Sequence, residues 1–164
     1  AEVTMKRLLE DGSDPDGQLG RELDTLLKVV ADLDPQYQDT PDSAALYAKY
    51  LRKVKRQPAE ADAVLARCLE KNPDSYYLAD LLAQAHLAEG QHDDARRVYG
   101  QALDILSRVR DQNPWTQATA AAAHLVLGRP EEASQRFREA VDIDRKSTRL
   151  NSSHIPLSRM PSSA

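Results

Sequence analysis

Several short stretches of this chain carry side chains that could bind an ion or act in catalysis. The segment GSDPDG, residues 12–17, comes near the spacing of a calcium-binding loop, which places oxygen ligands at alternate positions. Its first ligand position is Gly12, Pro15 interrupts it, and Leu23 stands where the closing Glu is expected. We therefore interpret it as a solvated acidic turn, with calcium binding as the alternative.

A run of cations, LRKVKRQ at residues 51–57, could bind phosphate. Cations also suit the C-terminal end of a helix, where the unpaired carbonyl groups carry partial negative charge. We favour the helix end as the interpretation.

Two histidines, His86 and His124, occupy equivalent places in two similar stretches, which raises the question of a metal or catalytic role. No Cys, His or carboxylate recurs with them, and a zinc site needs several such ligands. We interpret both as packing residues at a helix interface. Cys68 stands where a small residue is needed, so a buried inert thiol is favoured over a nucleophile. With no phosphate-binding glycine loop or nucleophile elbow in view, the sequence predicts no metal, no cofactor and no enzyme.

The elements that position these residues form a repeat. Two stretches, which begin near Tyr76 and Trp115, share a His, a Gly four residues on, an Ala five further, an aromatic four later and a small residue after three more. The two series are His86, Gly90, Ala95, Tyr99, Ala102 and His124, Gly128, Ala133, Phe137, Ala140. A weaker third copy begins upstream at Ala61. Each of the two clear copies predicts two helices joined by a tight turn at its Gly.

The repeat length points to a known family. Ala61 lies 34 residues before Ala95, which is the period of the tetratricopeptide repeat. All three copies resemble the second helix of that family, and the resemblance covers roughly residues 42–143. It implies an all-α fold in which helix-turn-helix repeats stack as an α-solenoid. The spacing from Ala95 to Ala133 is four residues longer, about one helical turn, so we expect a long helix that runs to near Asp111.

The chain is expected to divide into three parts. Residues 1–17 form an N-terminal linker or the end of a preceding element, and residues 18–143 form the repeat domain. Within this domain we expect a first helix near 18–33, followed by helix pairs at about 42–72, 74–111 and 114–143. No stretch alternates with period two over more than a few residues, so no sheet is expected.

The third part, residues 144–164, reads as translated sequencing adapter rather than as natural protein. Its first residues, DRKSTRLNSSH, are what a common short-read adapter encodes, and the adapter frame resumes after a short index. We therefore interpret this segment as a non-native tail and expect it to be disordered. We also expect the chain to be an internal fragment, with the natural protein continuing past Ile143.

Composition narrows the class of partner. The whole chain carries a net charge of −4, and its body is more acidic still because the tail is basic. An acidic body argues against nucleic-acid binding, which needs a clustered basic face. No apolar run approaches the length of a membrane span, and a single cysteine fits a reducing compartment. We expect a cytoplasmic location, with no nucleic-acid and no membrane partner.

The resemblance also implies a function, that of a protein–protein interaction scaffold. Members of the family grip a peptide or partner helix on the concave face, which the first helices of the pairs line. Carried over by position, the candidate binding residues are Tyr50, Tyr77, Asp80, Gln84, Trp115 and Leu125. Tyr77 and Trp115 share one repeat position and are predicted to form an aromatic hot spot, with packing against neighbouring repeats as the alternative.

Two further expectations complete the functional prediction. The chain could instead be the regulatory or sensory segment of a larger regulator or enzyme, whose catalytic or DNA-binding part lies outside the sequence. The last repeat lacks a capping helix, so we also expect exposed apolar surface there and self-association.

Overall fold

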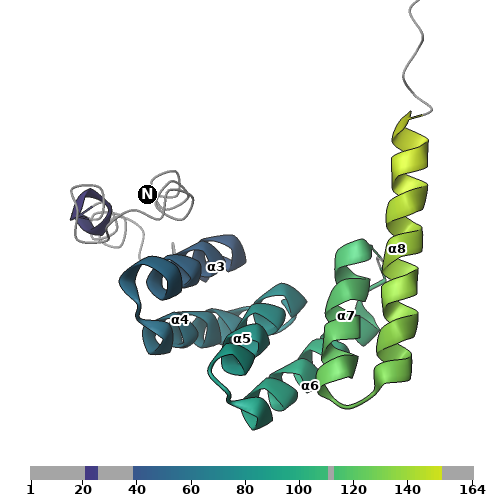
Figure 1. Ribbon diagram of the computed structural model, residues 1–164. Coiled ribbons are helices and arrows are strands. Elements are labelled where there is room, and N and C mark those ends of the chain that lie inside the picture. The colour runs from purple at the N-terminus through teal and green to yellow at the C-terminus, as the bar shows by residue number, and fades with distance from the viewer. Residues whose placement is uncertain (1–20, 26–38, 111–112, 153–164) are drawn as a thin grey trace, which may run out of the picture.

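The computed structural model describes residues 21–25, 39–110 and 113–152, and these contain helices and no strand (Figure 1). Residues 21–25 are helical, within the helix predicted near 18–33. The elements that follow are α3 (Pro41–Tyr50), the π-helix η2 (Leu51–Lys55), α4 (Pro58–Lys71), α5 (Tyr76–Ala88), α6 (His92–Arg108), α7 (Pro114–Val126) and α8 (Pro130–Ser152). The predicted linker at 1–17, with its acidic turn, lies outside the described residues.

The helices are arranged as pairs. α3 packs on α4, α5 on α6 and α7 on α8, while α4 against α5 and α6 against α7 join one pair to the next. In Figure 1 the pairs follow one another in a row from α3 to α8. The described chain is therefore an all-α array of helix-turn-helix repeats, as the sequence predicts.

The turns inside the last two pairs are the same. Gly90 and Gly128 both have φ of 76°, in the left-handed region that favours glycine. In each turn the amide after the Gly donates to the carbonyl of the repeat histidine at 2.8 Å, from Gln91 to His86 and from Arg129 to His124. This hydrogen bond closes the helix C-terminus in the manner of a Schellman motif.

The helix starts are set by proline and by capping side chains. Proline is pre-organised for the first helical position, where its missing N–H costs nothing. The helices that begin with it are those at Pro41, Pro58, Pro114 and Pro130. α5 begins instead with Ser75, whose hydroxyl accepts from the Leu78 amide at 3.3 Å, and Asn113 and Thr116 form a capping box at α7.

The core lies between the helices and is built largely from small residues. Ala61 and Ala95, at the same repeat position, are fully buried, which lets paired helices approach closely. Tyr99 of α6 belongs to the same core and is 1% exposed. Leucine and valine complete the core, with Leu65, Leu78, Leu82 and Val98 all buried.

Three helix ends differ from expectation, beginning with α6. This helix ends at Arg108 rather than near Asp111, with Val109 already extended at ψ of 120°. The Ser107 hydroxyl and the Arg108 Nε both donate to the Asp104 carbonyl, at 2.7 and 3.3 Å. Such side-chain donors compete with the backbone hydrogen bonds that would extend a helix.

The end of α3 also differs, because it widens into the π-helix η2. Arg56 follows with φ of 58°, and the Gln57 amide donates to the Leu51 carbonyl at 2.9 Å. The basic run at 51–57 therefore lies at the C-terminal end of a helix, which confirms the interpretation drawn from its charge.

The third difference is at the end of α8, which continues past Ile143 to Ser152. No Gly or Pro interrupts the helix after Pro130, and Arg, Lys and Leu are good helix formers, so an existing helix propagates through this segment. The adapter-like segment is helical over 144–152, and 153–164 lie outside the described residues.

Candidate functional site

A groove of about 790 Å³ lies between α3 and α5, the first helices of the first two pairs. We call it the α3–α5 groove. Its apolar lining is Ala45, Leu46, Ala48, Leu65, Tyr77, Leu81, Ala85 and Ala88. Its polar lining is Asp42, Lys49, Arg52 and Gln84. A lining that is mainly apolar with a few polar groups is typical of a ligand-binding site.

Tyr77 is the largest side chain that is both in this groove and accessible. Its residue is 42% exposed, so part of the ring is free for a ligand while the rest packs against the protein. Burial raises the pKa of the Tyr77 hydroxyl, and the carboxylates of Asp42 and Asp80 add to the effect. The phenol therefore stays neutral and can donate a hydrogen bond at any physiological pH.

The two cations of the groove differ in what they already contact. Arg52 is paired with Asp62 and, at 3.0 Å, with Glu89, so its charge is largely satisfied by the protein. Lys49 is exposed, and no ion pair within the described part of the chain involves it. Lys49 is therefore the cation that a bound partner can use.

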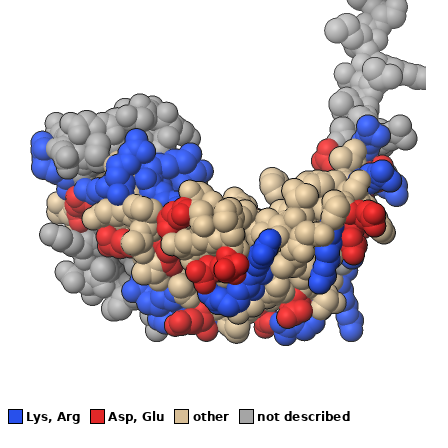
Figure 2. Space-filling model, turned by 60° about the horizontal axis from the view of Figure 1, so that its bottom comes forward, with Lys and Arg blue, Asp and Glu red and all other residues tan. Residues whose placement is uncertain are grey.

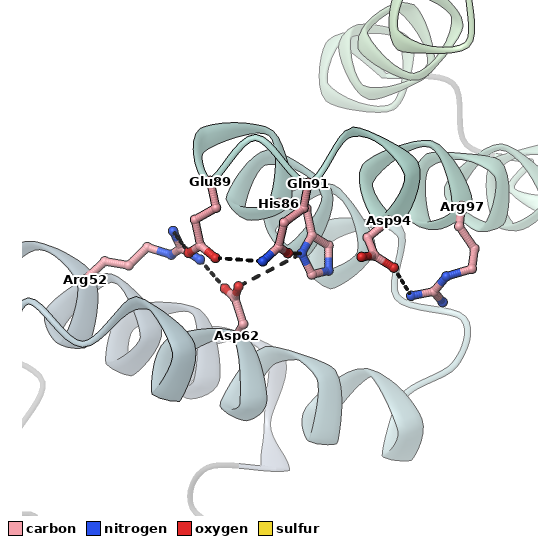
Figure 3. A network of polar contacts seen from close by, with 7 residues as sticks. All are labelled: Arg52, Asp62, His86, Glu89, Gln91, Asp94 and Arg97. Atoms are coloured by element: carbon pink, nitrogen blue, oxygen red, sulfur yellow. Dashed lines mark hydrogen bonds and ion pairs between the residues drawn. The ribbon is translucent and has the colours of Figure 1, made fainter.

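A polar network holds the end of the groove in shape (Figure 3). Asp62 of α4 lies between Arg52 of η2 and His86 of α5, whose Nδ1 is 4.0 Å from Asp62 Oδ2. The same Nδ1 is 2.5 Å from Oε1 of Gln91, in the turn before α6. The network ties η2, α4, α5 and the α5–α6 turn together, and we interpret it as structural.

Charged side chains of both signs lie on the face that Figure 2 presents. Lys and Arg gather over the upper left of this face, beside the grey residues, and the two signs are interspersed over the rest of it. Nucleic-acid binding requires a continuous basic face, whereas the basic area in this view covers only part of one face.

Asp80 points away from the groove and into the interior. Its Oδ2 accepts from Gln84 Nε2 at 2.8 Å, while its Oδ1 is buried and has no hydrogen-bond partner among the described residues. Burial raises the pKa of the Asp80 carboxyl, and interactions with Gln84, Tyr99 and Thr119 oppose the rise. Since Tyr99 is in α6 and Thr119 in α7, Asp80 belongs to the interface between the second and third pairs.

The remaining predicted site residues are distributed over the molecule. Tyr50 is buried, its ring stacks on Tyr47 at 6.4 Å, and its hydroxyl donates to Asp24 at 3.3 Å, so it is a packing residue. Trp115 is 77% exposed at the start of α7, outside the lining of the α3–α5 groove. Leu125 is exposed on a different cavity, along α8. The structure thus brings together Tyr77 and Gln84 and leaves the other four elsewhere.

Two residues of the groove were not predicted, although the sequence carries a signal for each. Leu81 is four residues after Tyr77, on the same face of α5, and Lys49 is three after Leu46 on α3. The Asp62–His86 pair was not predicted either, because it joins two repeats and has no local signal in the sequence.

Cys68 is fully buried, as predicted. Its Sγ donates to the Asp39 carbonyl at 3.2 Å, and burial raises the pKa of the thiol, so it stays protonated and inert. Within residues 21–25, 39–110 and 113–152, no three His, Cys, Asp or Glu side chains are arranged to hold a metal ion. No helix in the same part of the chain has the length and apolar character that crossing a membrane requires.

Comparison with known proteins finds a family model that matches part of the chain and solved structures of similar fold. Residues 75–146 match the model of the tetratricopeptide repeat. No curated protein sequence matches the chain.

Solved structures match over most of the chain. A structure titled "Crystal structure of MamA" shares 17% identity at a TM-score of 0.51, over 90% of this chain and 89% of that one. TTC0263, a thermophilic TPR protein in Thermus thermophilus, shares 18% at a TM-score of 0.52, over 93% and 86%. A further structure, "MamA MSR-1 C2", shares 23% at a TM-score of 0.48, over 80% and 70%. At such identities the likeness concerns the fold alone.

Proposed function

Because residues 75–146 match the tetratricopeptide repeat model, we propose that this chain is a protein-interaction scaffold and that its α3–α5 groove binds a peptide or partner helix. Repeats of this type support a scaffold role in general. The more specific proposal depends on the groove itself. Its lining is mainly apolar, and it contains a cation, Lys49, that forms no ion pair within the described part of the chain.

The observation that carries the proposal is the half-exposed Tyr77 ring, which shares the groove with Leu46 and Leu81. An aromatic anchor in a partly desolvated groove is the usual centre of a binding hot spot. The ligand that fits is a segment with an apolar side chain over Tyr77 and an acidic group near Lys49. Asp80, one of the predicted binding residues, is half-buried and interacts with Tyr99 and Thr119 of the following elements, so this proposal does not include it.

Peptides selected from a random library for binding to the wild-type protein test this proposal. We expect Tyr77→Ala to weaken the binding of a selected peptide by about 2 kcal/mol, roughly thirtyfold. Lys49→Glu should weaken the binding of acidic peptides in addition. Glu131→Ala, on the exposed start of α8, is the matched control and should bind as the wild type does. Peptides that bind Tyr77→Ala as tightly as the wild type would refute the groove as the site.

A second interaction surface lies along α8. A cavity of about 620 Å³ is bordered by Leu125, Phe137 and Val141, all of which are exposed large apolar residues. We propose that a second copy of the chain covers this surface, so that the protein self-associates. Sedimentation velocity should show a concentration-dependent dimer that Phe137→Glu abolishes, and a monomer at all concentrations would exclude it.

We assign no catalytic role to this chain and place it in the cytoplasm as part of the same proposal. The alternative function is that of a regulatory or sensory segment within a larger regulator or enzyme. The gene sequence that flanks this segment distinguishes the two, because a catalytic or DNA-binding domain would be encoded there.

A further inference from the structure

A separate polar cavity of about 350 Å³ lies where α6, α7 and α8 meet. Three basic side chains line it: His124 of α7, Arg129 of the α7–α8 turn and Arg136 of α8. The other lining residues are Leu103, Leu106, Ser107, Thr116, Gln117 and Ala120. None of the described residues that line it is acidic, in contrast to the α3–α5 groove.

The equivalent place in the preceding repeat has the opposite character. There, His86 takes the place of His124, and its Nδ1 is 2.5 Å from Gln91 Oε1 and 4.0 Å from the Asp62 carboxylate. Figure 3 shows Asp62 held between His86 and Arg52. In the second repeat the protein itself therefore supplies the anion beside this histidine.

In the third repeat no carboxylate is among the described residues that line the cavity. Arg129 stands at the position of Gln91, and a guanidinium has only donors, so it cannot accept from the ring. His124 Nδ1 is accordingly buried without a hydrogen-bond partner among the described residues. Burial lowers the pKa of His124, Arg129 and Arg136 lower it further, and Glu132 partly offsets them.

Both guanidinium groups keep donors available. Arg136 contacts Gln117 Oε1 at 3.3 Å and Glu139 Oε2 at 3.2 Å, and both contacts use its Nη1. Within the described part of the chain, its Nη2 and Nε have no partner, and Arg129 is exposed and forms no ion pair. Arginine donors in this state bind carboxylate or phosphate oxygens through charge-assisted hydrogen bonds.

We propose that this cavity is a binding site for a small oxyanion, a carboxylate or phosphate group, held between Arg129 and Arg136 beside the His124 ring. The oxyanion lies beside His124 as the Asp62 carboxylate lies beside His86 in the preceding repeat. It comes either from solution or from an acidic side chain of a bound partner.

Titration with inorganic phosphate and, separately, with acetate tests the proposal on the full chain. The ring signals of His124 are followed by NMR at constant ionic strength, with His86 as the internal control. We expect a saturable shift of the His124 signals and none for His86. Saturation by acetate identifies a carboxylate site of the kind that an acidic side chain would fill, and saturation by phosphate alone identifies a phosphate site.

Variants assign the binding to the cavity. Arg129→Gln introduces the residue type that the preceding repeat has at this position, Gln91, and Arg136→Gln removes the second guanidinium. Each variant should therefore lower the affinity for the anion by about tenfold or more. Arg96→Gln, at an exposed arginine of α6 that does not line the cavity, is the matched control and should bind normally. Circular dichroism confirms that each variant is folded.

A gain-of-charge variant gives an independent check. Ser107 lines the cavity, so Ser107→Asp should place a built-in carboxylate there, as Asp62 does beside His86, and should abolish the binding of added anion. A linear, unsaturated shift, an equal response of His86, or wild-type affinity in both Arg129→Gln and Arg136→Gln would overturn the proposal.

Discussion

Tyr99 and Phe137 occupy the same position in two consecutive repeats, but their surroundings differ. Tyr99 is 1% exposed, and its helix α6 packs against α7 of the next pair, whereas Phe137 is 47% exposed on α8. The small residues of the two repeats do not differ in this way. Ala95 and Ala133 are both buried, as expected if the partner helix of the same pair covers them.

The comparison separates two kinds of packing that one sequence pattern encodes. The alanine side chains are buried within one helix pair, so each repeat can bury its own alanine. The aromatic side chain becomes fully buried only when another repeat follows along the array. Stability in such an array is accordingly a sum of contributions within repeats and between neighbours.

The largest predicted effect comes from the aromatic position. Tyr99→Ala removes a fully buried ring and should lower the free energy of unfolding by about 3–5 kcal/mol. Phe137→Ala removes a ring that is already half in water and should cost about 1 kcal/mol. Urea denaturation of the two variants measures the difference, and equal losses would show that α8 is covered to the same extent as α6.

The alanine position should give a smaller and more similar pair of effects. Ala95→Leu overpacks the contact between α5 and α6 and should cost about 1–3 kcal/mol. Ala133→Leu should fall at the lower end of that range, because Ala133 also borders the open cavity beside α8. Glu131→Leu, on the exposed start of α8, is the control and should change stability little. If all three are tolerated alike, the alignment of the repeats is wrong.

The two turn glycines offer a comparison in which burial has no part. A Cβ added at Gly90 or Gly128 would meet nothing within 4 Å, so the only cost of alanine is the left-handed backbone. Each substitution should therefore lower stability by about 1–2 kcal/mol, and by the same amount in both repeats. Thermal denaturation is sufficient to compare them. A cost confined to one repeat would mean that the two turns are not equivalent.

The features that the sequence could predict are the ones that recur. The helix pairs, the glycine turns and the buried small residues follow from the spacing of Ala61, Ala95 and Ala133, because local geometry is enough to set them. The binding residues could be predicted only in part. Tyr77 and Gln84 line one groove, but Tyr50 is buried against Asp24, a residue of the N-terminal segment that no repeat pattern describes.

The rest depends on contacts between repeats, which spacing alone does not reveal. Asp80 was predicted to face a partner, yet it turns toward Tyr99 and Thr119 of the following elements. The cluster of His124, Arg129 and Arg136 likewise forms only when α7 and α8 close on α6.

Asp80 itself provides a pH-dependent test of the contact between the second and third repeats. The third repeat has Ala118 at the equivalent position, so only the second carries this buried carboxyl. Burial raises the pKa of Asp80 in the folded state above the ordinary value for an aspartate. The folded protein therefore holds the proton more tightly than the unfolded chain, and stability falls as pH rises from the unfolded pKa through the folded one.

We expect Asp80→Asn to remove this decline. The variant should be more stable than the wild type at neutral pH, and the difference should shrink as pH falls below the unfolded pKa of Asp80. Urea denaturation at a series of pH values measures it. Parallel pH profiles for the two proteins would mean that the carboxyl is solvated rather than buried.

The smallest predicted effect concerns the aromatic residues at the starts of α5 and α7. Tyr77 and Trp115 share one repeat position, but Tyr77 lies in the α3–α5 groove, whereas Trp115 is 77% exposed and does not line it. Trp115→Ala should therefore change the free energy of unfolding by no more than about 0.5 kcal/mol. Trp115 is the only tryptophan, so emission from the folded protein should resemble that of a solvated indole and should be quenched by iodide. A blue-shifted emission that iodide does not reach, together with an unfolded Trp115→Ala, would instead place this ring in a contact between copies or repeats. The third repeat would then bury its first-helix aromatic more deeply than the second, which reverses the order found for Tyr99 and Phe137.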